Sequence, residues 1–288
     1  MSKELVSVIM PTYNRGYIIK RAIDSILSQT YENLELIIVD DFSTDNTENI
    51  INSYNDSRII YIKLEKNMGA NYARNVGFQN SNGKYITFQD SDDYSFTTRI
   101  EEQIKALKEN KVDWVFTAFN KIDRNKRKKF PKNKIESDEI YNKLLFGNFV
   151  STQVLLCKRK ILEKISFDES LPRFQDWDLA LRISKKYKGF HIDTVLLDMY
   201  IQDDSITRNP QKGSKALSII FNKYNEDLND SQRAKIICRI GIFKMLNREQ
   251  AKEEFFISTK LDKSIKYKLI YILYRIKLLK FIYKIVKG

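Results

Sequence analysis

Three aspartates lie within four positions of the chain, at Asp90, Asp92 and Asp93. They follow residues 85–88, an apolar run that is typical of a short strand. Like charges this close repel one another unless a cation lies among them. Magnesium is bound by one or two carboxylates together with phosphate oxygens. The cluster therefore predicts a divalent cation site, and the alternative from these residues alone is a solvated acidic turn.

The elements that must position these aspartates alternate between strand and helix. Apolar or β-branched runs predict four strands, at 5–10, 34–39, 59–64 and 85–88. Helices are expected between them, and Asp45 and Glu48 have the spacing of a capping box for the second. This alternation predicts an α/β fold with a doubly wound, mostly parallel sheet flanked by helices.

Polar segments follow the predicted strands. In a sheet of this kind the ligand crevice lies beyond the carboxyl ends of the strands, so segments 11–14, 40–41, 67–74 and 90–93 are expected along one rim. Carboxylates there could bind a uracil N–H, a ribose or a metal, and Arg74 near a helix start could bind phosphate. Neither a G-x-G-x-x-G nor a Walker A sequence is present, which disfavours ordinary dinucleotide or P-loop ATP binding.

The second half of the chain offers one more candidate for chemistry. Asp176 falls at the start of a predicted helix, where it could be an N-cap or a general base held ionised by the helix N-terminus. His191 is expected in a strand, as a structural residue. Segment 150–157 is expected to be another strand, and the basic run from Lys121 to Lys134 an exposed, solvated hairpin or loop.

Taken together, these segments resemble the family 2 glycosyltransferases, which are inverting enzymes with the GT-A fold. The residues that carry the resemblance are VSVIMPTYN at 6–14, IVDDFSTDNT at 38–47, NMGANYARNVG at 67–77, DSDD at 90–93 and QDWDL at 175–179. They occur in the family's order and at its spacing, and the resemblance covers roughly residues 5–210.

The resemblance implies a role for each matched residue. The nucleotide-sugar site would comprise Pro11, Thr12, Tyr13, Asn14, Asp40, Asp41, Asn67, Arg74, Asp90, Ser91 and Asp93. Asp41 would bind the uracil, and Arg74 would face the base or the phosphates. Asp92, with Asp90, would hold Mn²⁺ or Mg²⁺, and Asp176 would be the catalytic base.

Two positions depart from the family pattern. Gln175 stands before the base, where many members have Glu. Many members also have a histidine after the last core strand, where this chain has Gln202 followed by Asp203. Gln202 is therefore only a candidate third metal ligand, and Asp203 could substitute for it.

The composition of the chain excludes or disfavours several kinds of site and indicates a cellular compartment. One histidine and two cysteines, Cys157 and Cys238, exclude a His-rich zinc site and a disulfide framework, and they disfavour Ser-His-Asp catalysis. Few cysteines favour a reducing compartment. The N-terminal apolar run is too short for a signal peptide. We therefore expect a cytoplasmic protein.

The C-terminal segment carries most of the net charge. Residues 232–288 hold 15 Lys/Arg and 4 Asp/Glu, or +11 of the formal +13. Helical patterns replace strand patterns after about residue 209, which predicts a GT-A domain over 1–210 and a basic helical extension over 211–288. Residues 262–287 predict an amphipathic helix with Lys277, Lys280, Lys284 and Lys287 on one face. It could lie on anionic lipid, form an oligomer or fold back on the domain.

These observations predict a metal-dependent inverting glycosyltransferase that uses a nucleotide-sugar, expected to be a UDP-sugar, and a glycan or lipid-linked acceptor. The alternatives are a sugar-phosphate nucleotidyltransferase, which would need a Gly-rich, Lys-containing loop after the first strand, and an inactive lipid- or nucleic-acid-binding module. Nucleic acid is not expected as a partner of the enzyme.

Overall fold

The computed structural model describes residues 4–124, 126–202 and 210–287, with side chains as far as residue 283. The chain divides into two compact units, which are described separately. The first comprises Met1–Glu169 and Leu179–Gln202, and the second comprises Ser170–Asp178 and Asp203–Gly288. The predicted boundary near residue 210 stays a prediction.

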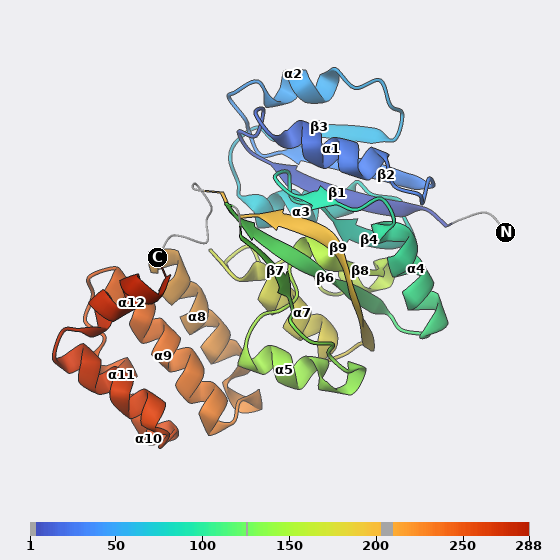
Figure 1. Cartoon of the computed structure of the whole chain (residues 1–288). Coiled ribbons are helices and arrows are strands. Elements are labelled where there is room, and N and C mark those ends of the chain that lie inside the picture. The colour runs from blue at the N-terminus through green and yellow to red at the C-terminus, as the bar shows by residue number, and fades with distance from the viewer. Residues whose placement is uncertain (1–3, 125, 203–209, 288) are drawn as a thin grey trace. The chain divides into compact units, whose positions relative to one another are not determined.

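Most elements of the first unit are labelled in Figure 1. Its strands are β1 (Val6–Thr12), β2 (Leu34–Asp40), β3 (Ile59–Lys63), β4 (Tyr85–Phe88), β5 (Tyr94–Ser95), β6 (Trp114–Asp123), β7 (Lys126–Phe130), β8 (Leu155–Lys158) and β9 (Gly189–Tyr200). Its helices are α1 (Ile19–Leu27), α2 (Thr47–Asn52), α3 (Ala70–Gln79), α4 (Arg99–Glu109), α5 (Ile140–Phe146) and α6 (Arg159–Leu162). Helix α7 (Gln175–Ser184) begins in the second unit and ends in the first.

The strands form one mixed sheet in the order β3-β2-β1-β4-β8-β6-β9-β5, with β7 paired to β6. The four strands predicted from the sequence, β1 to β4, are parallel to one another. Beyond them, β8 pairs antiparallel to both β4 and β6, and β6 pairs parallel to β9. The predicted α/β class is confirmed, and the parallel part is one half of the sheet.

Helices cover both faces of the parallel half. Alternate residues of β1 and β2 pack with the apolar stripes of α1 and α4 in one core cluster. On the opposite face, α3 lies so close to the sheet that a Cβ on Gly77 would stand 2.5 Å from Ile9 Cγ2. This is the arrangement of a doubly wound sheet, in which ligands bind beyond the carboxyl ends of the strands.

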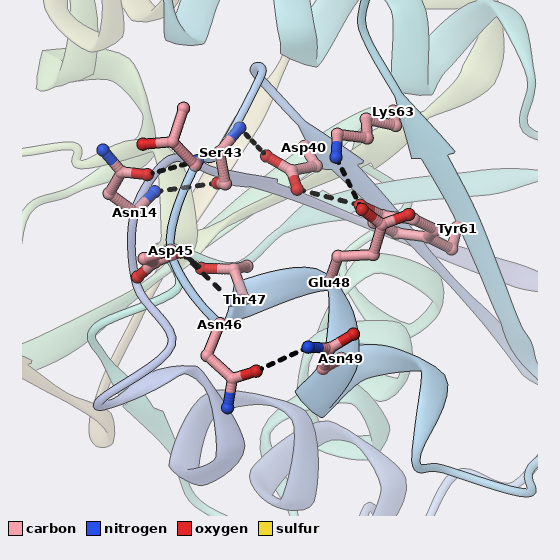
Figure 2. Close-up of polar contacts among 11 residues, drawn as sticks. Asn14, Asp40, Ser43, Asp45, Asn46, Thr47, Glu48, Asn49, Tyr61 and Lys63 are labelled. Carbon is pink, nitrogen blue, oxygen red and sulfur yellow. Dashed lines mark hydrogen bonds and ion pairs between the residues drawn. The ribbon is translucent and has the colours of Figure 1, made fainter.

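Two local predictions were wrong in detail. The strand expected over 150–157 is a 3₁₀ turn at Thr152–Val154 followed by the shorter β8. The capping box at Asp45 and Glu48 does not form, because α2 begins one residue later, after Asn46. Instead, Asp45 accepts the backbone N–H of Thr47, and Glu48 pairs with Lys63 on β3, as Figure 2 shows.

The basic run and the single histidine behave as predicted. Strands β6 and β7 form the hairpin that holds the basic run. His191 lies on β9 and is buried, its ring is stacked on Phe116 with centroids 4.6 Å apart, and its Nδ1 accepts the backbone N–H of Ile135 at 3.0 Å. Burial lowers the pKa of His191 to about 4.

This pKa gives a stability prediction. In the unfolded chain His191 takes up a proton near its ordinary pKa of about 6.5, so the folded state loses stability as the pH falls from there to about 4. We expect His191→Gln, which keeps an acceptor for Ile135, to remove up to about 3 kcal/mol of this loss. Urea unfolding of both proteins at pH 7 and pH 4.5 measures the difference. Parallel pH profiles would show that His191 is not the titrating group.

In residues 210–287 the second unit contains five α-helices: α8 (Pro210–Tyr224), α9 (Asp230–Leu246), α10 (Lys252–Leu261), α11 (Ile265–Arg275) and α12 (Leu279–Lys287). Phe255, Tyr267 and Leu279 are members of its core cluster, so α10, α11 and α12 pack together. The single helix predicted over 262–287 was wrong. It is broken after Ile276, and Lys277 has a left-handed φ of 59°. No helix among the described residues is long and apolar enough to span a membrane.

Candidate active site

The loops after β1 and β2 are joined by hydrogen bonds (Figure 2). The backbone N–H of Asn14 donates to Ser43 Oγ at 2.8 Å, and Thr44 N–H donates to Asn14 Oδ1 at 2.9 Å. Asp40 is fully buried and accepts Ser43 N–H and the Tyr61 hydroxyl, both at 2.8 Å. Both carboxylate oxygens of Asp40 are therefore used within the protein.

The loop after β2 is joined in turn to the start of α3. Asp41 accepts the backbone N–H groups of Met68 at 2.6 Å and Gly69 at 2.8 Å. Gly69 has a φ of 90°, a conformation that favours glycine. The pKa of Asp41 is raised by burial and by the charge of Asp40, and the two backbone N–H groups oppose that rise.

Arg74 joins the same helix to the segment after β4. Its Nη2 lies 2.8 Å from Asp90 Oδ1, and its side chain is 6% exposed. Its Nε and Nη1 atoms are buried and have no hydrogen-bond partner among the described residues, and the same holds for Thr12 Oγ1. Buried donors without partners are rare in folded proteins, and an unseen ion or ligand is one ordinary explanation. The donors of Arg74 suit an anion such as phosphate.

In the segment after β4, Asp93 is held by Gln153, a buried residue from a distant part of the chain. Asp93 is 1% exposed and accepts Gln153 Nε2 at 2.6 Å and Tyr200 N–H at 2.9 Å. Burial, followed by the charges of Asp92 and Asp90, raises the pKa of Asp93 well above its usual range. Arg99 is fully buried and donates to the Gln153 carbonyl at 2.7 Å, and burial lowers its pKa to about 9.

The remaining donor-site candidates differ in exposure. Pro11, Thr12 and Ser91 are buried, whereas Tyr13 is 45% exposed. Asn67 donates through Nδ2 to the Asp41 carbonyl at 3.2 Å. The structure thus brings the four predicted rim segments together, and the hydrogen bonds run from Asn14 to Ser43, from Asp41 to Met68 and from Arg74 to Asp90.

The three aspartates after β4 do not converge on one point. Asp93 is directed to Gln153 and Tyr200, and Asp90 is directed to Arg74. No group of three His, Cys, Asp or Glu side chains suited to a metal occurs in the described parts of the chain. Asp92 is half-buried, and the Arg21 guanidinium fixes its backbone carbonyl. Carboxylate oxygens from Asp92 and Asp90 nevertheless fit Mg²⁺ or Mn²⁺, because such ions take their other ligands from phosphates and water.

Gln202 is half-buried two residues after the end of β9, and Asp203 lies outside the described residues. The predicted third ligand therefore stays a prediction.

Asp176 belongs to the second unit. It is the second residue of α7, not its N-cap, and its Oδ1 accepts the N–H of Trp177 at 2.8 Å. Phe174, just before the helix, has a left-handed φ of 64°, and the indole of Trp177 is completely buried. Burial, followed by the charge of Arg239, lowers the pKa of Arg173, and the charge of Asp176 opposes that fall. Asp176 is thus held on a rigid helix start with a guanidinium nearby.

Sequence reasoning missed the residues that support Asp93 and Asp92. These are Arg21, Arg99, Gln153 and Tyr200, and Arg21 also lies over the Tyr200 ring at 3.7 Å from its centroid. One signal was available, because Arg99 stands four residues before Gln103 and eight before Leu107, at helical spacing on the buried side of α4. Gln153 carries no comparable signal.

Known structures identify the fold. The chain is similar to Staphylococcus aureus TarS 1-349 in complex with UDP-GlcNAc, with a TM-score of 0.65 and 19% identity over 94% of this chain and 91% of that one. It is also similar to the mannosyltransferase PcManGT of Pyrobaculum calidifontis in complex with GDP-Man and Mn²⁺, with a TM-score of 0.63 and 18% identity over 95% and 80% of the two chains. The fold is therefore that of the GT-A glycosyltransferases.

Sequence comparison then gives the family. Residues 7–166 match the family model for glycosyl transferase family 2. An uncharacterized glycosyltransferase, MJ1057 of Methanocaldococcus jannaschii, is 36% identical over 218 residues, which are 72% of this chain and 75% of that protein. The Escherichia coli UDP-Glc:alpha-D-GlcNAc-diphosphoundecaprenol beta-1,3-glucosyltransferase WfaP is 34% identical over 243 residues, or 81% and 87%. The chain belongs to glycosyl transferase family 2.

Proposed function

We propose that this enzyme is a metal-dependent inverting glycosyltransferase that moves a sugar from a UDP-sugar to a hydroxyl group of a lipid-linked or other cell-surface glycan precursor. The observation that carries the proposal is the pair of buried, unpartnered guanidinium nitrogens of Arg74, beside Asp90 at the carboxyl ends of the parallel strands. An anion at these donors, close to carboxylates that could hold a cation, matches a nucleoside diphosphate bound with its metal.

The choice of donor and acceptor rests on relatives. The names of two Escherichia coli relatives, WfaP and WfgD, both specify UDP-Glc and a GlcNAc-diphosphoundecaprenol acceptor. WfgD is 36% identical over 58% of this chain. TarS, similar in fold, has been solved with UDP-GlcNAc. A lipid-linked acceptor lies in a bilayer, so we also infer that the enzyme works at the cytoplasmic face of a membrane. Self-association stays a prediction.

The chain's own residues suit this chemistry. Arg74 would neutralise negative charge on the departing diphosphate, where charge develops in the transition state. A divalent cation at Asp92 would supply further charge neutralisation as a Lewis acid. Asp90 is paired with Arg74, and the resemblance to the family assigns the direct metal contact to Asp92. Asp41 and Asn14 are fixed by hydrogen bonds to backbone N–H groups or from their own, so these proposed contacts for the base would be in place before the nucleotide binds.

Asp176 would accept the proton of the acceptor hydroxyl as its oxygen attacks the anomeric carbon. The bond to the diphosphate breaks on the opposite side in the same displacement. A single displacement without a covalent intermediate inverts the configuration, as in the inverting glycosidases, where a carboxylate activates water.

Nucleotide-dependent thermal stability tests the donor site. We expect UDP, but not GDP or CDP, to raise the melting temperature in the presence of Mn²⁺, because a ligand that binds only the folded state adds about 2.7 kcal/mol at 100 times its dissociation constant. Asp92→Ala should remove the Mn²⁺-dependent part of the shift. Asp193→Ala, which removes an exposed carboxylate paired with Lys129 on the β7–β9 surface, is the control. Equal UDP shifts with and without Mn²⁺ would contradict metal-dependent binding.

A further inference from the structure

Helix α11 presents an apolar face that is not packed against its own unit. Ile265, Leu269, Ile272 and Ile276 are 81%, 52%, 53% and 55% exposed, respectively. At 3.6 residues per turn these four side chains fall within about 60° of one another around the helix axis. They are called the α11 stripe below. Single exposed apolar residues are ordinary on protein surfaces, but a continuous stripe along a whole helix indicates a partner.

The opposite face of α11 already has its packing partners. Tyr267 is buried in the core of the unit, and the Tyr274 hydroxyl accepts the N–H of Ala251 at 3.0 Å. The Tyr274 ring lies 4.8 Å from that of Phe255 on α10. The orientation of the helix is therefore fixed, and the α11 stripe is the side that remains outside.

The apolar surface continues past the break in the helix. Leu279 returns to the core, while Leu278 and Phe281 are 47% and 64% exposed. The left-handed conformation of Lys277 makes this turn, so the end of α11 and the start of α12 both contribute exposed apolar side chains. The surface is thus larger than one helix face, although neither helix is long enough to span a bilayer.

The charged side chains of α11 itself are all positive. Lys268 and Arg275 flank it on one side and Lys266 on the other, and all three are exposed. After Asp262 the sequence contains eight basic residues and no acidic one. Two copies of such a surface would repel each other, whereas a bilayer with anionic headgroups offers both an apolar interior and negative charge. A basic polar rim around an apolar face is the pattern of helices that lie in the membrane interface.

We propose that the α11 stripe, together with Leu278 and Phe281, inserts into the headgroup region of an anionic lipid bilayer, with Lys266, Lys268 and Arg275 in contact with the lipid headgroups. This surface binds lipid itself, independently of any donor or acceptor in the catalytic site.

Vesicle sedimentation with the full chain tests the proposal. We expect binding to vesicles of phosphatidylglycerol and phosphatidylcholine at low salt, and much weaker binding to phosphatidylcholine alone. Leu269→Asn/Ile272→Asn should lower the partition coefficient at least about tenfold, because two apolar side chains no longer leave water. Lys266→Gln/Lys268→Gln should lower it about fivefold for each charge removed and should reduce its salt dependence.

Phe146→Asn is the matched control, since Phe146 on α5 is 40% exposed but lies in the other unit. It should bind vesicles as the wild type does, and unchanged melting temperatures should show that all variants fold. Wild-type protein that ignores anionic vesicles, or full binding by Leu269→Asn/Ile272→Asn, would overturn the proposal. If the stripe variant instead converts a dimer to a monomer without loss of vesicle binding, the occupant is a second copy. None of these outcomes depends on UDP binding or sugar transfer.

Discussion

Replacing Asp176 with asparagine is expected to lower kcat for sugar transfer by about 10²–10⁴-fold, the usual contribution of a general base. Asparagine keeps the side-chain oxygen that accepts the N–H of Trp177, so the start of α7 should be undisturbed. The variant loses the negative charge of the carboxylate and with it the capacity to take a proton. Steady-state transfer assays with a UDP-sugar and a lipid-linked acceptor measure the effect.

Donor binding supplies the control for this variant. Asp176→Asn should retain the UDP-dependent thermal shift in the presence of Mn²⁺, because the predicted donor residues lie on other segments. The matched substitution Asp230→Asn removes an exposed carboxylate from the first turn of α9 and should leave kcat unchanged. Turnover by Asp176→Asn within about tenfold of the wild type would remove Asp176 from the role of base.

The second large effect on catalysis is expected when the Arg74 guanidinium is removed. We expect Arg74→Ala to lower kcat/KM by about 10²–10³-fold, in the range found when one preorganised donor to a developing negative charge is lost. Arg74→Lys should recover only part of this, because an ammonium group cannot supply the fork of donors whose Nε and Nη1 are unpartnered in the protein. The same variants should need higher UDP concentrations for a given thermal shift.

Arg58→Ala provides the comparison for Arg74. Arg58 also pairs with a nearby aspartate, Asp56, but lies before β3 at the opposite end of that strand from the rim. Its substitution should leave kcat/KM and the UDP shift unchanged. If Arg74→Ala reduced thermal stability but kept its affinity for UDP, Arg74 would be a structural partner of Asp90 and not a ligand for the diphosphate.

The parallel half of the fold could be predicted because its information is local. Each strand from β1 to β4 is a short apolar run, and β1, β2 and β3 are each followed by a helix. The other half depends on pairing between distant segments. Nothing near Leu155 indicates that β8 would enter the sheet antiparallel between β4 and β6.

In the candidate site, too, the features set by local sequence could be predicted and those set by distant segments could not. The four rim segments were predicted to lie together because parallel strands end at the same edge, and Arg74 does reach Asp90. The support for Asp93 was missed, because Gln153 is 60 residues away in sequence and meets it only through the order of the strands. The break after Ile276 was missed for a related reason: no Gly or Pro marks it, and it coincides with the return of Leu279 to the core.

The hydrogen bonds of Asp41 limit how this pocket can be redesigned. One carboxylate secures the turn into α3 through Met68 and Gly69 and is also the proposed contact for the base of the nucleotide. An asparagine there would place an amide N–H₂ against a backbone N–H, so a change aimed at nucleotide preference would also loosen the helix that carries Arg74. Engineering of donor choice in this enzyme should therefore begin at the exposed Tyr13, where a side chain can be exchanged without altering the scaffold.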